Sequence, residues 1–317
     1  TGEIAQQLGR NRRTIQRELA RGSVTQNVDW VLVDRYCADY AQRGCRLRAA
    51  NKGRGLKIGH CHALAEYLEK KIVQERYSPD AALNGCKAQG LAFEVSICTK
   101  TLYNYIDWGV FAGISNRDLP VKKAGRKRHY RSRRVALNNL KGRSIEERPQ
   151  VVNERNEFGH WEMDCVESGG GAKACLLVLT ERVSRGELIF KMEAKTQVCV
   201  ETVLDALERR HKGAFPKYFK SITVDNGPEF LCFTRLEASS RVKGTKRTTL
   251  YYAHPYSAWE RGSNENANKL IRRFIPKGAD IGRYSGQDIR RIERWMNHYP
   301  RRLLGYKTPL QLMAALL

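Results

Sequence analysis

From residue 159 onward, the chain contains short runs in which apolar and polar residues alternate, and longer runs in which apolar residues recur every three to four positions. Alternation is typical of strands, and the longer spacing is typical of helices that bury one face. This order of elements predicts a mixed sheet covered by helices, an α/β fold. The predicted strands are 159–167, 173–181, 186–193, 220–225 and 248–253, and the predicted helices are 197–212, 264–275 and 286–298.

The first 20 residues follow a helical pattern, with a glycine-containing break between two short helices. This layout is typical of a helix-turn-helix, whose second helix enters the major groove of DNA. Arg and Gln, which bind guanine and adenine edges, are dense on the second helix. A solvated helical hairpin is the alternative. Thr1 falls inside the motif and is not Met, so we expect further sequence before it. The predicted DNA contacts are Arg12, Arg13, Gln16, Arg17 and Arg21.

A second helical region lies at 61–116. A clean helical pattern at 63–73 is followed by helix starts at 78–83 and 98–106, each with a capping Ser or Thr. Pro79 occupies the first helical position of the earlier start. The region is therefore a second helix-turn-helix candidate. The side chains that we expect to face outward from its last helix are Lys100, Thr101, Tyr103 and Asn104.

Two basic segments separate these regions. Residues 23–60 form a connector that either follows phosphates or is simply solvated, and 117–156 form a linker in which most positions of 122–134 are Lys or Arg. Such dense charge favours sequence-independent contact with a phosphate backbone. The predicted linker contacts are Arg126, Lys127, Arg128 and Arg131. The predicted domains are 1–22, 23–60, 61–116, 117–156 and 157–317.

The net charge of the chain indicates its partner. Its 317 residues include 57 Lys and Arg against 33 Asp and Glu, a formal charge of +24. So basic a protein repels itself unless it binds a polyanion, and nucleic acid is the expected one. We find no apolar run of about 18 residues and no signal-peptide layout, which argues against a membrane protein. We expect a cytoplasmic protein.

The nine cysteines are scattered, without a Cys-x-x-Cys pair. Several lie in apolar runs, so we interpret them as reduced core residues. The cluster His60-Cys61-His62 is the one place that suggests zinc, and its spacing matches no established ligand pattern.

Three acidic residues form the candidate catalytic set. Asp164 and Asp225 end short apolar strands, and Glu265 lies in the first turn of a helix capped by Ser263. Alternation places Asp164 on the sheet face opposite Trp161. Magnesium prefers hard oxygen ligands, and a two-metal site needs such ligands on rigid elements that hold the ions about 4 Å apart. The pattern predicts a two-metal site that acts on a phosphodiester.

Other acids compete for these roles. Glu162 and Glu167 flank Asp164, Glu229 follows Asp225 by four positions, and Glu260 precedes Glu265 by five. A surface ion pair explains any single acid equally well, but the occurrence of Asp164, Asp225 and Glu265 in this order favours a catalytic role. We interpret Glu260 as a polar turn residue.

Six segments around and after these acids carry recognisable motifs. They are GHWEMD at 159–164, VDNGPEF at 224–230, PYSAWERGSNEN at 255–266, LIRRFIPK at 270–277, YPRR at 299–302 and YKTP at 306–309. Together these segments resemble the IS30 family of bacterial insertion-sequence transposases. The resemblance implies an RNase H-like catalytic domain of the retroviral-integrase type. It also implies an Asp-Asp-Glu triad of Asp164, Asp225 and Glu265 that binds Mg²⁺, with Mn²⁺ as a substitute.

The spacing of the triad departs from the family pattern. Between Asp225 and Glu265 lie 39 residues, more than the mid-thirties that are usual, whereas Glu260 would give 34. We retain Glu265 because its Asn-Glu-Asn context and helix start match the family position, and the basic segment 239–247 can absorb the excess as a loop.

The resemblance also implies partners. We expect a nucleoid-associated bacterial transposase that nicks DNA at the element ends and joins the 3′-OH to target DNA, acting as a homodimer or larger assembly. The helix-turn-helix units would bind terminal inverted repeats. Two other classes remain, a non-catalytic DNA-binding regulator and an RNase H-like nuclease. Three basic residues near the third acid either contact phosphate or form a solvated face, and they are Lys269, Arg272 and Arg273. Two aromatic residues, His254 and Trp259, could stack on a DNA base, although we favour a packed turn for Trp259.

Overall fold

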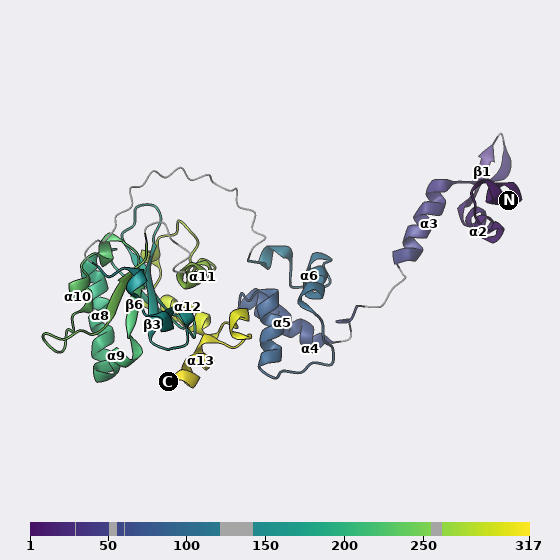
Figure 1. Cartoon of the computed structure of the whole chain (residues 1–317). Helices are drawn as coiled ribbons and strands as arrows, with labels where there is room; N and C mark the ends of the chain where they lie inside the picture. The colour runs from purple at the N-terminus through teal and green to yellow at the C-terminus, as the bar shows by residue number, and fades with distance from the viewer. Residues whose placement is uncertain (29, 51–55, 60, 121–141, 255–261) are drawn as a thin grey trace. The chain divides into compact units, whose positions relative to one another are not determined.

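The computed structural model describes residues 1–28, 30–50, 56–59, 61–120, 142–254 and 262–317 (Figure 1). Contacts between Cα atoms divide the chain into two compact units, Thr1–Cys61 and His62–Leu317. The second unit begins at His62, and the predicted domain boundaries stay predictions. Within the described ranges, no helix is both long enough and apolar enough to cross a membrane.

The first unit begins with two short helices. Asn11 caps the second helix by accepting a hydrogen bond from the Arg13 amide at 2.9 Å. The segment that we predicted as a connector contains a hairpin and a helix. Every residue of its second strand is exposed, so the strand has no buried face that alternation could reveal. The elements are α1 (Gly2–Gln7), α2 (Arg12–Gly22), β1 (Ser23–Val28), β2 (Val31–Tyr36) and α3 (Ala38–Ala50).

The second unit opens with the predicted helical region. Ser78 caps α5 by accepting a hydrogen bond from the Ala81 amide at 3.2 Å, and Pro79 is its first residue. The cap of α6 differs from the prediction, because Cys98 holds that position without a side-chain capping bond and Thr99 is already helical. The elements are α4 (His62–Glu69), the π-helical turn η1 (Lys70–Gln74), α5 (Pro79–Ala88) and α6 (Thr99–Asp107).

A five-stranded mixed sheet forms the centre of the second unit, as predicted. Its strand order is β5-β4-β3-β6-β7. β3 pairs antiparallel with β4 and parallel with β6, and β6 pairs parallel with β7. The described sheet and its helices are compatible with an RNase H-like core. The strands are β3 (His160–Glu167), β4 (Cys175–Glu181), β5 (Glu187–Met192), β6 (Ser221–Val224) and β7 (Thr249–Tyr252).

Helices cover the sheet on both faces (Figure 1). Trp161 and Met163 of β3 point into an apolar core shared with Leu204 of α8, as the alternation predicted. The intervening residue Glu162 points to the opposite face and contacts α11. The helices are α7 (Gln150–Glu154), α8 (Gln197–His211), α9 (Phe215–Tyr218), α10 (Phe233–Glu237), α11 (Gly262–Ile271), α12 (Gly286–His298) and α13 (Pro309–Leu316).

The turn before α5 packs against the end of α12 within the same unit. Trp295 Nε1 donates a hydrogen bond to the Glu75 carbonyl at 2.6 Å, and Tyr77 Oη donates to the His298 carbonyl at 3.1 Å. Ser78 Oγ and Tyr299 Oη lie 2.9 Å apart. These contacts attach the helical region to the elements that surround the sheet.

Candidate active site

Asp164 and Asp225 lie on neighbouring parallel strands. The parallel register pairs Glu162 of β3 with Thr223 of β6. Asp164 follows Glu162 by two residues, and Asp225 follows Thr223 by two, so the two aspartates stand level where β6 ends. Both side chains are half-buried. The register therefore brings two of the three predicted carboxylates to the same level of the sheet, where β6 ends.

The turn after β6 fixes the backbone at Asp225. Asp225 Oδ1 accepts a hydrogen bond from the Gly227 amide at 3.0 Å, and Asn226 Nδ2 donates to the Ala253 carbonyl at 2.8 Å. An Asp that bonds the amide two residues later is a common turn device. The predicted turn is present, and it holds Asp225 at the strand end.

α11 packs against Asp164. Asn268 Nδ2 donates a hydrogen bond to Asp164 Oδ2 at 2.8 Å. Glu265 precedes Asn268 by three positions, so both project from the same side of the helix. The helix that carries the third predicted acid therefore turns that side toward the first aspartate.

The carboxylate of Glu265 is itself turned to solvent. Its side chain is 62% exposed, and its Oε1 forms an ion pair with Lys269 Nζ at 2.8 Å. No three His, Cys, Asp or Glu side chains among the described residues are grouped closely enough to hold a metal ion. The structure thus places Glu265 on the adjoining helix face without bringing its carboxylate to the aspartates. Glu260 lies outside the described residues.

Glu162 holds the start of α11. It is fully buried and accepts hydrogen bonds from the Ser263 amide at 3.1 Å, Ser263 Oγ at 3.1 Å and the Asn264 amide at 3.3 Å. Arg182 forms a buried ion pair with the same carboxylate. A carboxylate at a helix N-terminus satisfies free amides and complements the helix dipole. Sequence reasoning noted Glu162 only as a competitor of Asp164, although alternation places both on one face.

Lys195 engages the two other competing acids. Its Nζ lies 2.7 Å from Glu167 Oε1 and 3.2 Å from Glu229 Oε1. Burial raises the pKa of Glu229. Burial alone would lower the pKa of Lys195, but the two neighbouring carboxylates outweigh it and raise that pKa. Lys195 follows β5 and carried no signal in the sequence, because its partners lie far away in the chain. Glu167 and Glu229 are therefore both ion-paired with Lys195.

The predicted DNA contacts of the helical regions are mostly exposed. Arg12, Arg13, Gln16 and Arg17 are all exposed on α2, as is Arg21. On α6, Lys100, Tyr103 and Asn104 are exposed, whereas Thr101 is half-buried and its hydroxyl lies 3.2 Å from Cys98 Sγ. The predicted contacts in the basic linker lie outside the described residues, and they are Arg126, Lys127, Arg128 and Arg131.

The basic residues of α11 and its end have different surroundings. Lys269 is exposed, whereas Arg272 donates to the backbone carbonyl of Glu167 at 3.2 Å. Arg273 lies over the Trp295 ring at 5.6 Å from its centroid and donates to the Arg76 carbonyl at 3.1 Å. Packing thus already occupies two of the three predicted phosphate contacts. His254 pairs with Glu146 at 3.5 Å, and Trp259 lies outside the described residues.

Sequence comparison places the chain among known proteins. No protein-family model matches it. It is 34% identical over 332 residues to the probable transposase for insertion-like sequence element IS1161 of Streptococcus salivarius. That alignment covers 98% of this chain and 87% of the other protein. The chain is also 31% identical to the transposase InsI for IS30C of Escherichia coli K12, over 60% of this chain and 46% of that protein. The chain belongs to the IS30 family of insertion-sequence transposases.

A more distant relative of this transposase supports the assignment. The transposase for IS4351 of Bacteroides fragilis is 28% identical over 96% of this chain and 87% of that protein. The predicted family membership is therefore confirmed. In this transposase, 160–164 of the first family motif lies in β3, 224–230 begins in β6, and the described part of 255–266 opens α11.

Proposed function

We propose that this transposase nicks DNA at the ends of its insertion sequence and joins the freed 3′-OH to target DNA at Asp164, Asp225 and Glu265. The observation that carries the proposal is the level placement of Asp164 and Asp225 on adjacent parallel strands, with α11 hydrogen-bonded to Asp164 through Asn268. Oxygen ligands on rigid elements suit a metal-dependent phosphoryl transfer. The relatives named as transposases support the same reaction class.

The donor set fits Mg²⁺, for which Mn²⁺ would substitute. When bound, the ions activate water and stabilise charge on the attacking and leaving oxygens. The protein supplies the placement: β3 and β6 hold the aspartates, and Glu162 fixes the start of α11. The Glu265–Lys269 pair is exposed, and such pairs contribute only about 0 to 1 kcal/mol. Glu265 can therefore leave Lys269 at little cost.

The exposed polar residues of α2 and α6 would bind the terminal inverted repeats, and the formal charge of +24 would hold the DNA backbone. Cutting two ends and joining them to one target requires at least two active sites. We therefore expect a homodimer or larger assembly on DNA. Mass measurement of the complex with paired ends should give two or more copies, and a single copy per end pair would exclude this arrangement.

The choice of third acid can be tested by replacing each candidate in turn. Glu265→Gln should lower the rate of strand cleavage by about 10³-fold, because a catalytic metal ligand contributes several kcal/mol to the transition state. Glu260→Gln is the matched control and should cleave like the wild type. The assay measures nicks in a duplex that contains the DNA flanking the coding frame. Loss of cleavage in Glu260→Gln with full activity in Glu265→Gln would reverse the assignment.

A further inference from the structure

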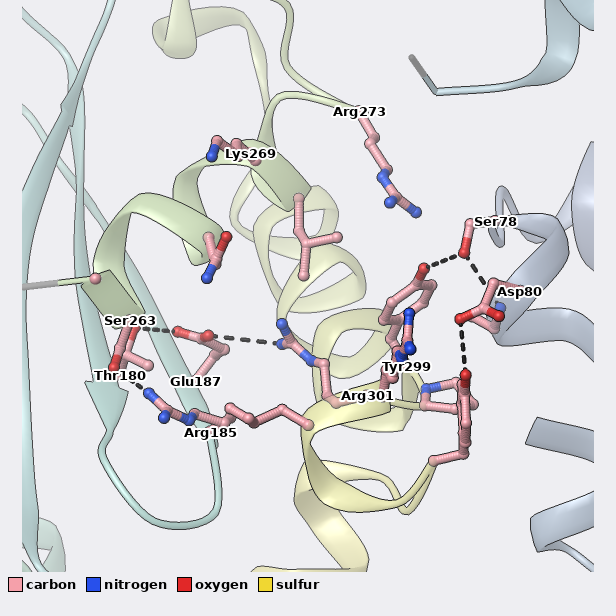
Figure 2. Close-up of a pocket in the computed structure, with 18 of the residues that line it drawn as sticks. Ser78, Asp80, Thr180, Arg185, Glu187, Ser263, Lys269, Arg273, Tyr299 and Arg301 are labelled. Atoms are coloured by element: carbon pink, nitrogen blue, oxygen red, sulfur yellow. Dashed lines mark hydrogen bonds and ion pairs between the residues drawn. The ribbon is translucent and has the colours of Figure 1, made fainter. Parts of the chain in front are cut away.

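A cavity of about 600 Å³ lies along one side of α11 (Figure 2). Asn266, Lys269 and Leu270 of α11 line it, together with Arg273 just beyond the end of the helix. Lys269 lies on the same side of α11 as Glu265. Its other walls come from the start of α5, the β4–β5 hairpin and the segment after α12. We call it the basic cavity.

Cationic side chains dominate the lining of the basic cavity. Its two acids are already engaged, since Asp80 accepts a hydrogen bond from Tyr306 Oη at 3.0 Å and Glu187 accepts one from Thr180 Oγ1 at 2.7 Å. Burial raises the pKa of Glu187 to about 8, so this carboxyl is largely protonated at neutral pH. The six lining cations are Arg155, Arg185, Lys269, Arg273, Arg301 and Arg302.

Several of these cations have hydrogen-bonding capacity left. Arg301 lies 3.6 Å from Glu187, and its buried Nε finds no acceptor among the described residues. Within the described ranges, the side chains of Arg155 and Arg302 make no hydrogen bond or ion pair, although the Arg302 carbonyl accepts a hydrogen bond from the Gly305 amide. Figure 2 shows Arg301 and Arg185 reaching into the cavity from its wall, with Lys269 on α11 and Arg273 on the segment just after the helix. Of these unpaired donors only Arg301 Nε is buried, and a buried donor without an acceptor is costly and favours an anionic partner.

We propose that the basic cavity binds a phosphate group of the DNA backbone, an inference that rests on the proposed function. Guanidinium groups match phosphate oxygens through paired N–H donors. About 600 Å³ exceeds what one phosphate needs and leaves room for the attached sugar. Lys269 lines the cavity and also pairs with Glu265, so the held phosphate lies on the helix that carries the third acid. The cavity thereby positions the DNA strand beside the candidate active site.

The test combines protein and DNA substitutions in the full chain. Arg155→Gln and Arg302→Gln each remove one lining cation, and Arg283→Gln is the matched control because Arg283 is 86% exposed and lies outside the lining. Binding to an end-containing duplex is measured as salt is varied. Each lining variant should lower the slope of log affinity against log salt by about 1. The control should change it less.

A set of duplexes with single neutral methylphosphonates near the nick site then identifies the contact. At one position, the methylphosphonate should weaken binding of the duplex to the wild type. At that same position it should not weaken binding further to Arg155→Gln or Arg302→Gln. Losses that add at every position would overturn the proposal. Titration with inorganic phosphate, followed by thermal unfolding, separates the sources. The contrary result is that phosphate raises the unfolding temperature of the wild type but not of Arg155→Gln, while the two proteins bind DNA equally. That result would assign the cavity to free phosphate and overturn the DNA assignment.

These outcomes are distinguishable from failure of the proposed function. If the two lining variants bind and cleave DNA like the wild type while Asp164→Asn does not cleave, the cavity assignment is wrong and the catalytic proposal stands. If the methylphosphonate effect appears and no variant or wild-type protein cleaves DNA, the cavity binds DNA and the catalytic proposal is wrong.

Discussion

Replacing Asp164 or Asp225 with Asn is expected to lower the rate of DNA strand cleavage by about 10³-fold and to leave DNA affinity within a few-fold of the wild type. Asn keeps the size and one oxygen of the side chain but removes the negative charge that a metal ligand supplies. A loss of about 4 kcal/mol in transition-state stabilisation corresponds to this factor. Binding survives because the exposed cations of α2 and α6 are untouched. Nicking of an end-containing duplex measures the first quantity, and gel retardation the second.

Glu167→Gln is the matched control for this prediction. Glu167 lies on the same strand as Asp164, yet it is exposed and paired with Lys195 at 2.7 Å. Its replacement should leave cleavage within a few-fold of the wild type. Cleavage by Asp225→Asn within about tenfold of the wild type would remove Asp225 from the catalytic set, since a lost metal ligand costs more than this.

Glu162→Ala is expected to destabilise the folded protein by about 3 to 5 kcal/mol. The substitution leaves the buried guanidinium of Arg182 without its partner, and removing one member of a buried ion pair carries this cost. It also leaves the Ser263 and Asn264 amides at the start of α11 without their acceptor. The shift in the urea midpoint, with the slope of the transition checked, gives the change in the free energy of unfolding.

Two variants show whether the cost arises from this arrangement. Glu162→Gln retains an acceptor for the Ser263 hydroxyl but no charge for Arg182, so it should fall between Glu162→Ala and the wild type. Glu265→Ala removes a carboxylate from the same helix and should change the free energy of unfolding by less than about 1 kcal/mol, because its pair with Lys269 is exposed. A loss below about 1 kcal/mol in Glu162→Ala would show that α11 does not depend on this cap.

The strands around the candidate site could be predicted because each has one or two buried faces. The stretch predicted at 159–167 forms β3 at His160–Glu167, and the helix predicted at 197–212 forms α8 at Gln197–His211. Trp161 and Met163 enter the core opposite Asp164, as the alternation indicated. The hairpin β1–β2 was missed for the converse reason, since the exposed residues of β2 leave no periodic signal.

The candidate site itself was only partly predictable. Asp225 directly follows β6, and such a strand end is a local feature that a sequence shows. The expectation that Asp164 also ends a strand was wrong, because β3 continues to Glu167 and Asp164 pairs with Val178 of β4.

The cap that Glu162 provides to α11 joins residues about a hundred positions apart, and no local pattern indicates such a contact. The ion pairs of Lys195 and Arg182 are equally hard to predict, because the packing of the sheet brings each of these residues to its partner. The cations of the basic cavity also come from distant segments that meet only in the fold.

The choice of Glu265 depends on both sources. Sequence context and the helix start favour it over Glu260, and the structure adds that its side of α11 packs on Asp164 through Asn268. Its carboxylate pairs with Lys269. Under the proposed function, Glu265 would leave Lys269 to serve as a third oxygen ligand of Mg²⁺.

The most direct test of the proposed three-carboxylate metal site is the dependence of strand nicking on Mg²⁺ concentration, measured side by side for the wild type and Asp225→Asn. We predict that the wild type nicks the end-containing duplex at a rate that rises with Mg²⁺ to a plateau and vanishes when the metal is chelated. Asp225→Asn should stay near background throughout. Nicking by the wild type at an unchanged rate in excess chelator, or equal rates for the two proteins, would contradict the account.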